Sequence, residues 1–395
     1  MRRLLVFVAL LVGLAPHAEA KVIEEHFSDG SVRVRREVRV LADGNEVDHG
    51  TYTRFFPDKK PASQIHYVDG RKEGPWTEWY LSGEKKIEGA YKNNQKDGPE
   101  VRYLEDGAKF LEQGYREGQR HGKRIDWYGS DRKAFEANYE QGVLHGEQRR
   151  WYPDGKPKEV RGYRRGEKHG LETQWFAGGD KYLEITYAKG RKQGPYREWY
   201  PGGKLKSEGA YRDGVLDGKL TKWHIDGKKE AEGEYRQGKL EGRWQLWHEG
   251  PENLPASDMT YKRGLPTGVH TLWHKNGKKR LEVSYQDGLR EGPWTEWHEN
   301  GSKRASGTYL HDKHDGVQYF WYDDGAKWSR KEYRKGEKHG RWVEWAKDGK
   351  VVSRRTYDRD NLIERSAPQA SSIPASAAKD NDTQGTAAPD SAPPK

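Results

Sequence analysis

The sequence predicts an all-β fold, an elongated ribbon or solenoid of antiparallel β-hairpins with about 12–13 repeats of 24 residues. Three observations predict it: tyrosine recurs at this period, glycine follows each of twelve tyrosines by seven places, and tryptophan follows eleven of them by twelve places. Chance does not keep such a register, and units of this length typically pack on their neighbours in a row. The opening tyrosines are Tyr67, Tyr91, Tyr115, Tyr139, Tyr163, Tyr187, Tyr211, Tyr235, Tyr261, Tyr285, Tyr309 and Tyr333.

Composition supports a thin fold. The chain is 32% hydrophobic and 34% charged, which is too polar to fill a thick core over 395 residues. Disordered chains are also polar, but they do not hold 16 Trp and 23 Tyr in strict register. The formal net charge of +10 suits either a solvated surface or an acidic partner.

Residues 1–20 read as a secretory signal peptide. Arg2 and Arg3 precede an apolar run, and Ala18 and Ala20 form a small-x-small cleavage site. An uncleaved anchor helix is the disfavoured alternative, because the apolar run has about half of the roughly 20 residues that a membrane span needs. We expect a periplasmic or extracellular protein with no transmembrane segment in the mature chain.

The chain contains no cysteine. Disulfides, thiolate metal sites, cysteine nucleophiles and a lipid-bearing N-terminal cysteine are therefore excluded. We expect an exported protein that is not a lipoprotein.

Residues 21–66 form the predicted N-terminal β cap. Ser31–Leu41 alternates valine with charged residues, as a half-buried strand does. Gly50 and Phe55 occupy the glycine and tryptophan positions of a degenerate thirteenth repeat that precedes Tyr67.

Within a repeat such as Tyr211–Glu234, we expect one strand to end at the tyrosine and a loop to lie between the two glycines. A second strand then carries the tryptophan, and Asp226-Gly227 reverses the chain as a two-residue hairpin turn. The repeat-defining structural residues are represented by Tyr67, Gly74, Trp79, Tyr139, Gly146, Trp151, Tyr211, Gly218, Trp223, Tyr285, Gly292 and Trp297.

The period-2 pattern of the strands predicts that one face stacks tyrosine, tryptophan and small residues while the other presents charge. The repeat array covers residues 67–357, with a two-residue insertion within 251–255 that suits a bulged loop. Residues 358–395 are rich in Ala, Pro and Ser, and we expect a disordered tail.

The iterated pattern Y-x2-G-x3-G-x4-W-x3-G resembles the MORN repeat, specifically the variant form of bacterial exported proteins that are sometimes labelled antitoxins. The likeness covers about three quarters of the chain, from Tyr67 to Gly349. It implies an antiparallel ribbon of successive hairpins that serves protein association or membrane-proximal scaffolding.

His224, His248, His274 and His298 follow the tryptophan in four consecutive repeats, where other repeats place Tyr or Phe. They are candidate ligand-facing residues. A metal ladder is disfavoured because adjacent repeats lie roughly 9.5 Å apart, too far for two imidazoles to share one ion at bonds of about 2 Å. A row of stacked rings is the favoured interpretation.

The aromatic residues allow two interpretations. They form the core, because a thin sheet needs large flat side chains, or they form a rail of platforms for glycan strands. The first is favoured.

No nucleophile elbow, catalytic triad or HExxH motif occurs, and the paired glycines open strands where a phosphate-binding loop opens a helix. We therefore expect no enzyme, no metal and no cofactor. Nucleic acid is an unexpected partner because acidic residues are interleaved with the basic ones.

The predicted function is an exported scaffold that mediates protein–protein interaction in the cell envelope. The alternatives are a binder of envelope polymer, such as peptidoglycan, lipopolysaccharide or an anionic membrane surface, and an antitoxin-like neutraliser of a partner protein.

Overall fold

The computed structural model describes residues 20–129 and 131–366. The predicted signal peptide up to Glu19, including Ala18 of the cleavage site, and the tail from residue 367 onward lie outside the described residues. Strands and turns make up the described part, and none of it forms a helix of the length and apolarity needed to cross a membrane.

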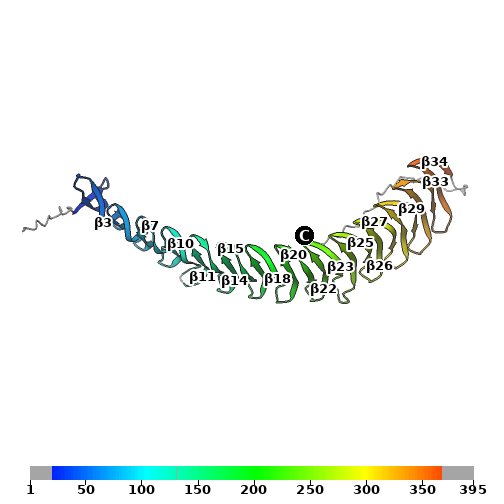
Figure 1. The fold of residues 1–395 in the computed structure, drawn as a ribbon, viewed down its shortest axis with the longest axis horizontal. Coiled ribbons are helices and arrows are strands. Elements are labelled where there is room, and N and C mark those ends of the chain that lie inside the picture. The colour runs from blue at the N-terminus through cyan, green and yellow to red at the C-terminus, as the bar shows by residue number, and fades with distance from the viewer. Residues whose placement is uncertain (1–19, 130, 367–395) are drawn as a thin grey trace, which may run out of the picture. The chain divides into compact units, whose positions relative to one another are not determined.

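The chain divides into two compact units on either side of the Gly242–Arg243 bond. Each is an open antiparallel sheet in which strands pair with their neighbours in sequence, as the succession of arrows shows (Figure 1). This confirms the predicted fold class. Strand β23, Lys239–Trp247, contains the boundary.

The strands of the first unit follow one another in sequence order, joined by turns. They are β1 (Ala20–His26), β2 (Val32–Val40), β3 (Glu46–Phe55), β4 (Pro61–Val68), β5 (Arg71–Trp79), β6 (Lys85–Lys92), β7 (Gln95–Lys96), β8 (Gly98–Tyr103), β9 (Lys109–Arg116), β10 (Gln119–Trp127), β11 (Lys133–Glu140), β12 (Val143–Leu144), β13 (Gly146–Trp151), β14 (Pro157–Arg164), β15 (Glu167–Lys168), β16 (Gly170–Trp175), β17 (Lys181–Ala188), β18 (Arg191–Trp199), β19 (Leu205–Arg212), β20 (Val215–Leu216), β21 (Gly218–Trp223) and β22 (Lys229–Arg236).

The second unit repeats the same alternation of strands. They are β24 (Pro255–Lys262), β25 (Leu265–Trp273), β26 (Lys279–Gln286), β27 (Leu289–Trp297), β28 (Lys303–Leu310), β29 (Lys313–Trp321), β30 (Lys327–Arg334), β31 (Glu337–Lys338), β32 (Gly340–Trp345), β33 (Val351–Asp358) and β34 (Asn361–Ser366).

The short turn of each hairpin lies two and three places after the opening tyrosine. In the repeat of Tyr211 it is Asp213-Gly214, with φ of 51° and 91°. Two consecutive positive φ angles are typical of the type I′ turn, whose twist matches that of the flanking strands. Our prediction of a loop between the two glycines is wrong, because most of this segment is strand, in β20 and the start of β21.

Two of the twelve full repeats place a longer side chain where the others have the short-turn glycine. Asp312 has φ of 65°, and its Oδ1 accepts a hydrogen bond of 2.9 Å from the backbone N–H of Arg290. Asn94 has φ of 67° and accepts the equivalent bond of 2.7 Å from Lys72. The left-handed backbone is one that Asn and Asp tolerate better than most residues, and here the bond to the neighbouring repeat stabilises it.

The long turn reverses the chain after the tryptophan. His224 N–H donates to the carbonyl of Lys228 at 2.8 Å, and Gly227 N–H donates back to the carbonyl of His224 at 2.9 Å. Gly227 alone has positive φ, while Asp226 Oδ1 accepts from the Lys228 N–H at 2.9 Å. The predicted two-residue turn is thus a longer turn, with Asp226 acting as an acceptor.

Strand register separates the opening tyrosine from the repeat tryptophan. Gly218 pairs with Tyr235 and Leu220 with Gly233, so Leu220 shares a face with Tyr235; Trp223 is three places further on and lies on the opposite face. We call the side of the opening tyrosines the tyrosine face. Our prediction that both aromatic residues stack on one face is wrong.

The core of the tyrosine face is built from the ninth residue after each opening tyrosine. Trp244 is 1% exposed and Gln318 0%, whereas the repeat tryptophans are only half-buried. Small residues opposite make room for these side chains: a Cβ on Gly209 would lie 2.8 Å from Tyr196 Cε1 and 3.2 Å from Leu220 Cδ1. The ninth residues are Trp76, Glu100, Arg124, Gln148, Glu172, Tyr196, Leu220, Trp244, His270, Trp294, Gln318 and Trp342.

The ends of the array extend the repeat pattern. Strand β2 falls within the predicted Ser31–Leu41, and Gly50 pairs with Tyr67 as later glycines do, which supports the degenerate repeat. At the other end, β33 and β34 pair as a further hairpin beyond the Tyr357 boundary that we predicted. The insertion widens one long turn, which closes through His248 N–H on the Leu254 carbonyl at 2.8 Å.

Candidate functional site: grooves along the tyrosine face

A row of rings follows the tryptophans and ties most repeats to the next. In unit 1, the Tyr200 hydroxyl donates to the carbonyl of Trp223 at 2.9 Å. In unit 2, His274 Nε2 lies 3.0 Å from the carbonyl oxygen of Trp297. Either tyrosine or histidine can occupy this position, because each carries a hydrogen-bond donor at the far end of its ring. The same contact is made by Tyr80, Tyr128, Tyr152, His248, His298 and Tyr322.

The four candidate histidines thus lie where the sequence placed them, one residue after each tryptophan. For His248, His274 and His298 the structure shows a different role from ring stacking, because Nε2 is held by a backbone carbonyl and only Nδ1 is left for another group. His224 begins the equivalent long turn. Within the described residues, no three His, Cys, Asp or Glu side chains are placed to hold a metal ion.

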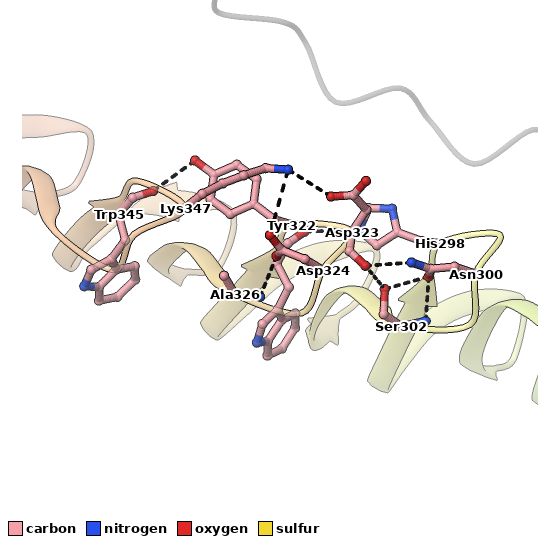
Figure 2. A network of polar contacts seen from close by, with 10 residues as sticks. His298, Asn300, Ser302, Tyr322, Asp323, Asp324, Ala326, Trp345 and Lys347 are labelled. Carbon is pink, nitrogen blue, oxygen red and sulfur yellow. Dashed lines mark hydrogen bonds and ion pairs between the residues drawn. The ribbon is translucent and has the colours of Figure 1, made fainter.

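The long turns of the second unit are also linked directly to one another (Figure 2). Asn300 Nδ2 donates to the Asp323 carbonyl at 2.6 Å, and Ser302 Oγ donates to the same oxygen at 2.8 Å. One turn further, Lys347 Nζ lies 3.2 Å from Asp323 Oδ1 and 5.5 Å from the centre of the Tyr322 ring. These exposed contacts order the edge beside the ring row.

A groove of about 420 Å³ opens on the tyrosine face of unit 2, between the rings of His248 and His274. Its apolar floor includes Leu246 and Leu272, two equivalent residues of neighbouring repeats, and Leu272 is 8% exposed. We call it the His248–His274 groove. The full lining is Leu246, His248, Ala256, Ser257, Leu272, Trp273, His274, Lys275, Arg280 and Glu299.

Polar groups of this groove lack partners within the protein. Ser257 is 4% exposed, and its Oγ forms no hydrogen bond. A buried hydroxyl without a partner costs about 1–3 kcal/mol, so such groups are rare and call for an explanation. Lys275 and Arg280 also line the groove, and within the described residues neither makes an ion pair, although Glu299 lies in the same lining.

The corresponding grooves of unit 1 hold arginine–carboxylate ion pairs, and Lys158, which lines both of them, makes no ion pair among the described residues. One of about 400 Å³ contains Arg124, whose guanidinium binds both oxygens of Asp126 at 2.9 Å. The next, of about 410 Å³, contains Arg150 and Glu159, which lie 3.7 Å apart. The carboxylate of Asp126 also raises the pKa of Arg124 through their hydrogen bond.

One buried and one half-buried histidine, His270 and His314, lie on the tyrosine face of unit 2, at sites that sequence reasoning missed. His270 stacks on Tyr285 with ring centres 4.5 Å apart, and His314 stacks on Tyr309 at the same distance. Burial lowers the pKa of His270. Burial also lowers the pKa of His314, and the positive charge of Arg290 acts in the same direction.

The repeat-defining residues form structure along the whole array. The predicted repeat glycines Gly74, Gly146, Gly218 and Gly292 all have positive φ, between 78° and 109°. Six opening tyrosines are covered by a basic residue five places after the preceding tyrosine, as where Lys192 Nζ lies 4.7 Å above the Tyr211 ring. Such cation–π contacts add to the packing of the tyrosine face.

The repeat tryptophans occupy the face opposite the tyrosine face. In the second unit, Lys279 Nζ lies 5.7 Å from the Trp297 ring and 2.8 Å from a Glu282 carboxylate oxygen. In the first unit, Tyr103 replaces tryptophan and donates to Glu88 at 2.5 Å; burial and this carboxylate raise the pKa of Tyr103 to about 12. The repeat tryptophans are therefore neither a dry core nor a free rail.

These features define a class of protein, an antiparallel β-hairpin repeat protein with recurrent shallow grooves. Five segments match the family model described as MORN repeat variant, at residues 48–69, 72–93, 144–164, 192–213 and 290–311. The protein therefore carries MORN repeats of the variant type, which confirms the predicted family. No curated protein matches the sequence significantly.

Among solved structures, the chain is similar to parts of much longer proteins. A crystal structure of TcdB2-TccC3 matches over 87% of this chain and 21% of that chain, with 9% identity and a TM-score of 0.16. A crystal structure of TcdB2-TccC3 without its hypervariable C-terminal region matches over 88% and 23%, with 10% identity and a TM-score of 0.14. These values are too low to transfer a fold or a function.

Proposed function

We propose that the protein is an exported, non-enzymatic repeat scaffold that binds another protein through its tyrosine face. The observation that carries the proposal is the recurrence of open grooves between successive rings, each of about 400 Å³. A row of similar shallow sites suits an extended partner that contacts several repeats, as repeat proteins commonly provide. A small substrate usually binds in one deep pocket.

The test is capture of a partner by the full chain from cell-envelope extracts, with identification by mass spectrometry. Binding should survive about 0.15 M salt, and it should weaken when bulky charge is placed in a groove, as in Leu272→Glu. A matched control is Val269→Glu, an exposed position of the same strand on the opposite face. Failure to capture any protein at low or moderate salt would contradict the proposal.

Export is tested separately. The full chain with a C-terminal tag is produced in a Gram-negative host, the periplasm and medium are separated from the cytoplasm, and the N-terminus is sequenced. We expect an exported form that begins at Lys21. A cytoplasmic protein that retains residues 1–20 would contradict this part of the proposal.

One observation favours a second function, the binding of an envelope polymer. Trp328 is 46% exposed on unit 2, and its ring lies 5.9 Å from Phe320 and 6.3 Å from Tyr322. An exposed ring beside half-buried aromatic rings can stack on sugar rings. Co-sedimentation with purified peptidoglycan or lipopolysaccharide should then occur and should be lost in Trp328→Ala. No co-sedimentation of the unaltered protein would exclude this function.

A further inference from the structure

The His248–His274 groove contains two cations without a carboxylate partner among the described residues, Lys275 and Arg280, whereas the grooves of unit 1 combine paired arginines with one such cation, Lys158. In unit 1, Arg124 is bound by Asp126 and Arg150 faces Glu159. In unit 2, Lys275 and Arg280 have no carboxylate at ion-pair distance among the described residues, although both line the groove. Two cations without carboxylate partners beside an apolar recess favour the binding of an acidic group.

Ser257 gives a second, independent observation. It is 4% exposed, lines the same groove, and its Oγ forms no hydrogen bond within the protein. A hydroxyl this deep normally has a partner. Its Oγ is itself covered, so a bound polar group would meet it only after the side chain turns toward the groove.

The apolar floor indicates what else the occupant carries. Leu246 and Leu272 belong to neighbouring repeats, and Leu272 is 8% exposed, so the apolar surface is recessed. A side chain that projects from a peptide reaches such a floor, whereas the flat surface of a membrane does not. The histidine rings fix the walls, because Nε2 of His248 and of His274 is held by a backbone carbonyl at 3.0 Å.

We infer that the His248–His274 groove binds an acidic peptide segment of a partner protein, with an apolar side chain on Leu246 and Leu272 and a neighbouring carboxylate between Lys275 and Arg280. The carboxylate binds through charge-assisted hydrogen bonds, and the apolar side chain supplies the buried anchor typical of such contacts. This inference rests on the proposed function and gives it a site and a partner class.

The experiment is a selection of random 12-residue peptides, displayed on phage, against the immobilised full chain. We expect selected peptides to contain Asp or Glu beside Leu, Ile, Phe or Met. Synthetic copies should bind Arg280→Glu and Lys275→Glu at least tenfold more weakly by fluorescence anisotropy, and Lys262→Glu within about twofold. Lys262 is an exposed cation of the same unit, outside the groove, so its reversal carries the same change of charge.

Arg280→Gln serves as a second variant, in case reversal of charge disturbs folding, and circular dichroism checks every variant. Selected peptides without acidic residues, or acidic peptides that bind Arg280→Glu as well as the unaltered protein, overturn the inference. No enrichment of any peptide also overturns it. Vesicles of phosphatidylglycerol that bind in an Arg280-dependent way, without peptide enrichment, assign the cations to an anionic lipid instead.

The two proposals fail in different ways. Capture of an envelope protein that is unaffected by Arg280→Glu and Lys275→Glu leaves the scaffold function standing and removes the groove as its site. Absence of any captured protein removes the scaffold function itself.

Discussion

His274 Nε2 lies 3.0 Å from the carbonyl oxygen of Trp297, 23 residues further along the chain. Tyr322 makes the same contact with Trp345 through its hydroxyl, at 3.0 Å. The Tyr and His rings that follow most of the repeat tryptophans therefore tie one long turn to the next strand. This relationship explains why His and Tyr share a position that neither metal binding nor ring stacking accounts for.

The first prediction concerns this bond. His274→Tyr should keep the stability of unit 2 within about 0.5 kcal/mol, because the hydroxyl replaces the ring N–H as donor, whereas His274→Leu should cost about 1–3 kcal/mol by leaving the carbonyl unpaired. Urea unfolding followed by circular dichroism measures both. Tyr322→Phe tests the same bond at another repeat, since it removes only the hydroxyl that donates to the Trp345 carbonyl, and it should also destabilise unit 2. Equal stability of the Tyr and Leu variants would show that the bond is unimportant.

The second prediction concerns the packing of the tyrosine face. Gly209→Ala should destabilise unit 1 by about 1–3 kcal/mol, as overpacking does, because its Cβ would lie 2.8 Å from Tyr196 Cε1. Gly178→Ala is the control: nothing lies within 4 Å of its added Cβ, and its φ is not positive. Thermal unfolding compares the two. A Gly178 variant as unstable as the Gly209 variant would contradict this account of the core.

The sequence predicted the repeat, the strands and the family because glycine and tryptophan recur at fixed spacing. It did not predict the core position, because Leu220, Glu172 and Gln318 occupy it in different repeats and show no shared chemistry. The structure accommodates this variety through local partners, as where Gln318 Oε1 accepts from Trp294 Nε1 at 3.0 Å. Pairwise compensation of this kind leaves no periodic signal.

The faces were mispredicted for a related reason. The sequence shows two aromatic rows but does not show that Leu220 is the core residue of its strand. Trp223 lies three places from Leu220 and therefore faces the other way, next to a bulge in the pairing with β22. The candidate histidines were found from their spacing, yet the groove between His248 and His274 was not. Its other residues, such as Ser257 and Arg280, come from different strands and do not recur along the chain.

The third prediction concerns the short turn at Asp312. Asp312→Gly should leave stability within about 1 kcal/mol, because glycine adopts positive φ freely and fills this position in most repeats. Asp312→Ala should cost about 1–3 kcal/mol, since it combines a strained backbone with loss of the bond to the Arg290 N–H. Hydrogen exchange at the Arg290 amide reports the effect locally. Slow exchange in the Ala variant would contradict it.

The fourth prediction is a pH dependence of unit 2. Burial lowers the pKa of His270 and of His314 in the folded state, while the unfolded chain keeps a value of about 6.5. Above that value both states are neutral and the stability is complete. As pH falls through it, the unfolded state binds protons first, so stability falls by up to about 1.4 kcal/mol per pH unit for each histidine, until pH drops below the folded values.

The measurement is urea unfolding between pH 5 and pH 8, compared among variants so that carboxylates shared by all of them cancel. His270→Tyr should flatten the slope between pH 5 and pH 6.5, because Tyr196 fills the equivalent position in unit 1 and tyrosine does not titrate there. His311→Asn is the control, since the His311 side chain is 73% exposed and Asn tolerates its positive φ. A slope that is unchanged by His270→Tyr but flattened by His311→Asn would place the acid sensitivity at the surface and contradict the burial of His270 as its cause.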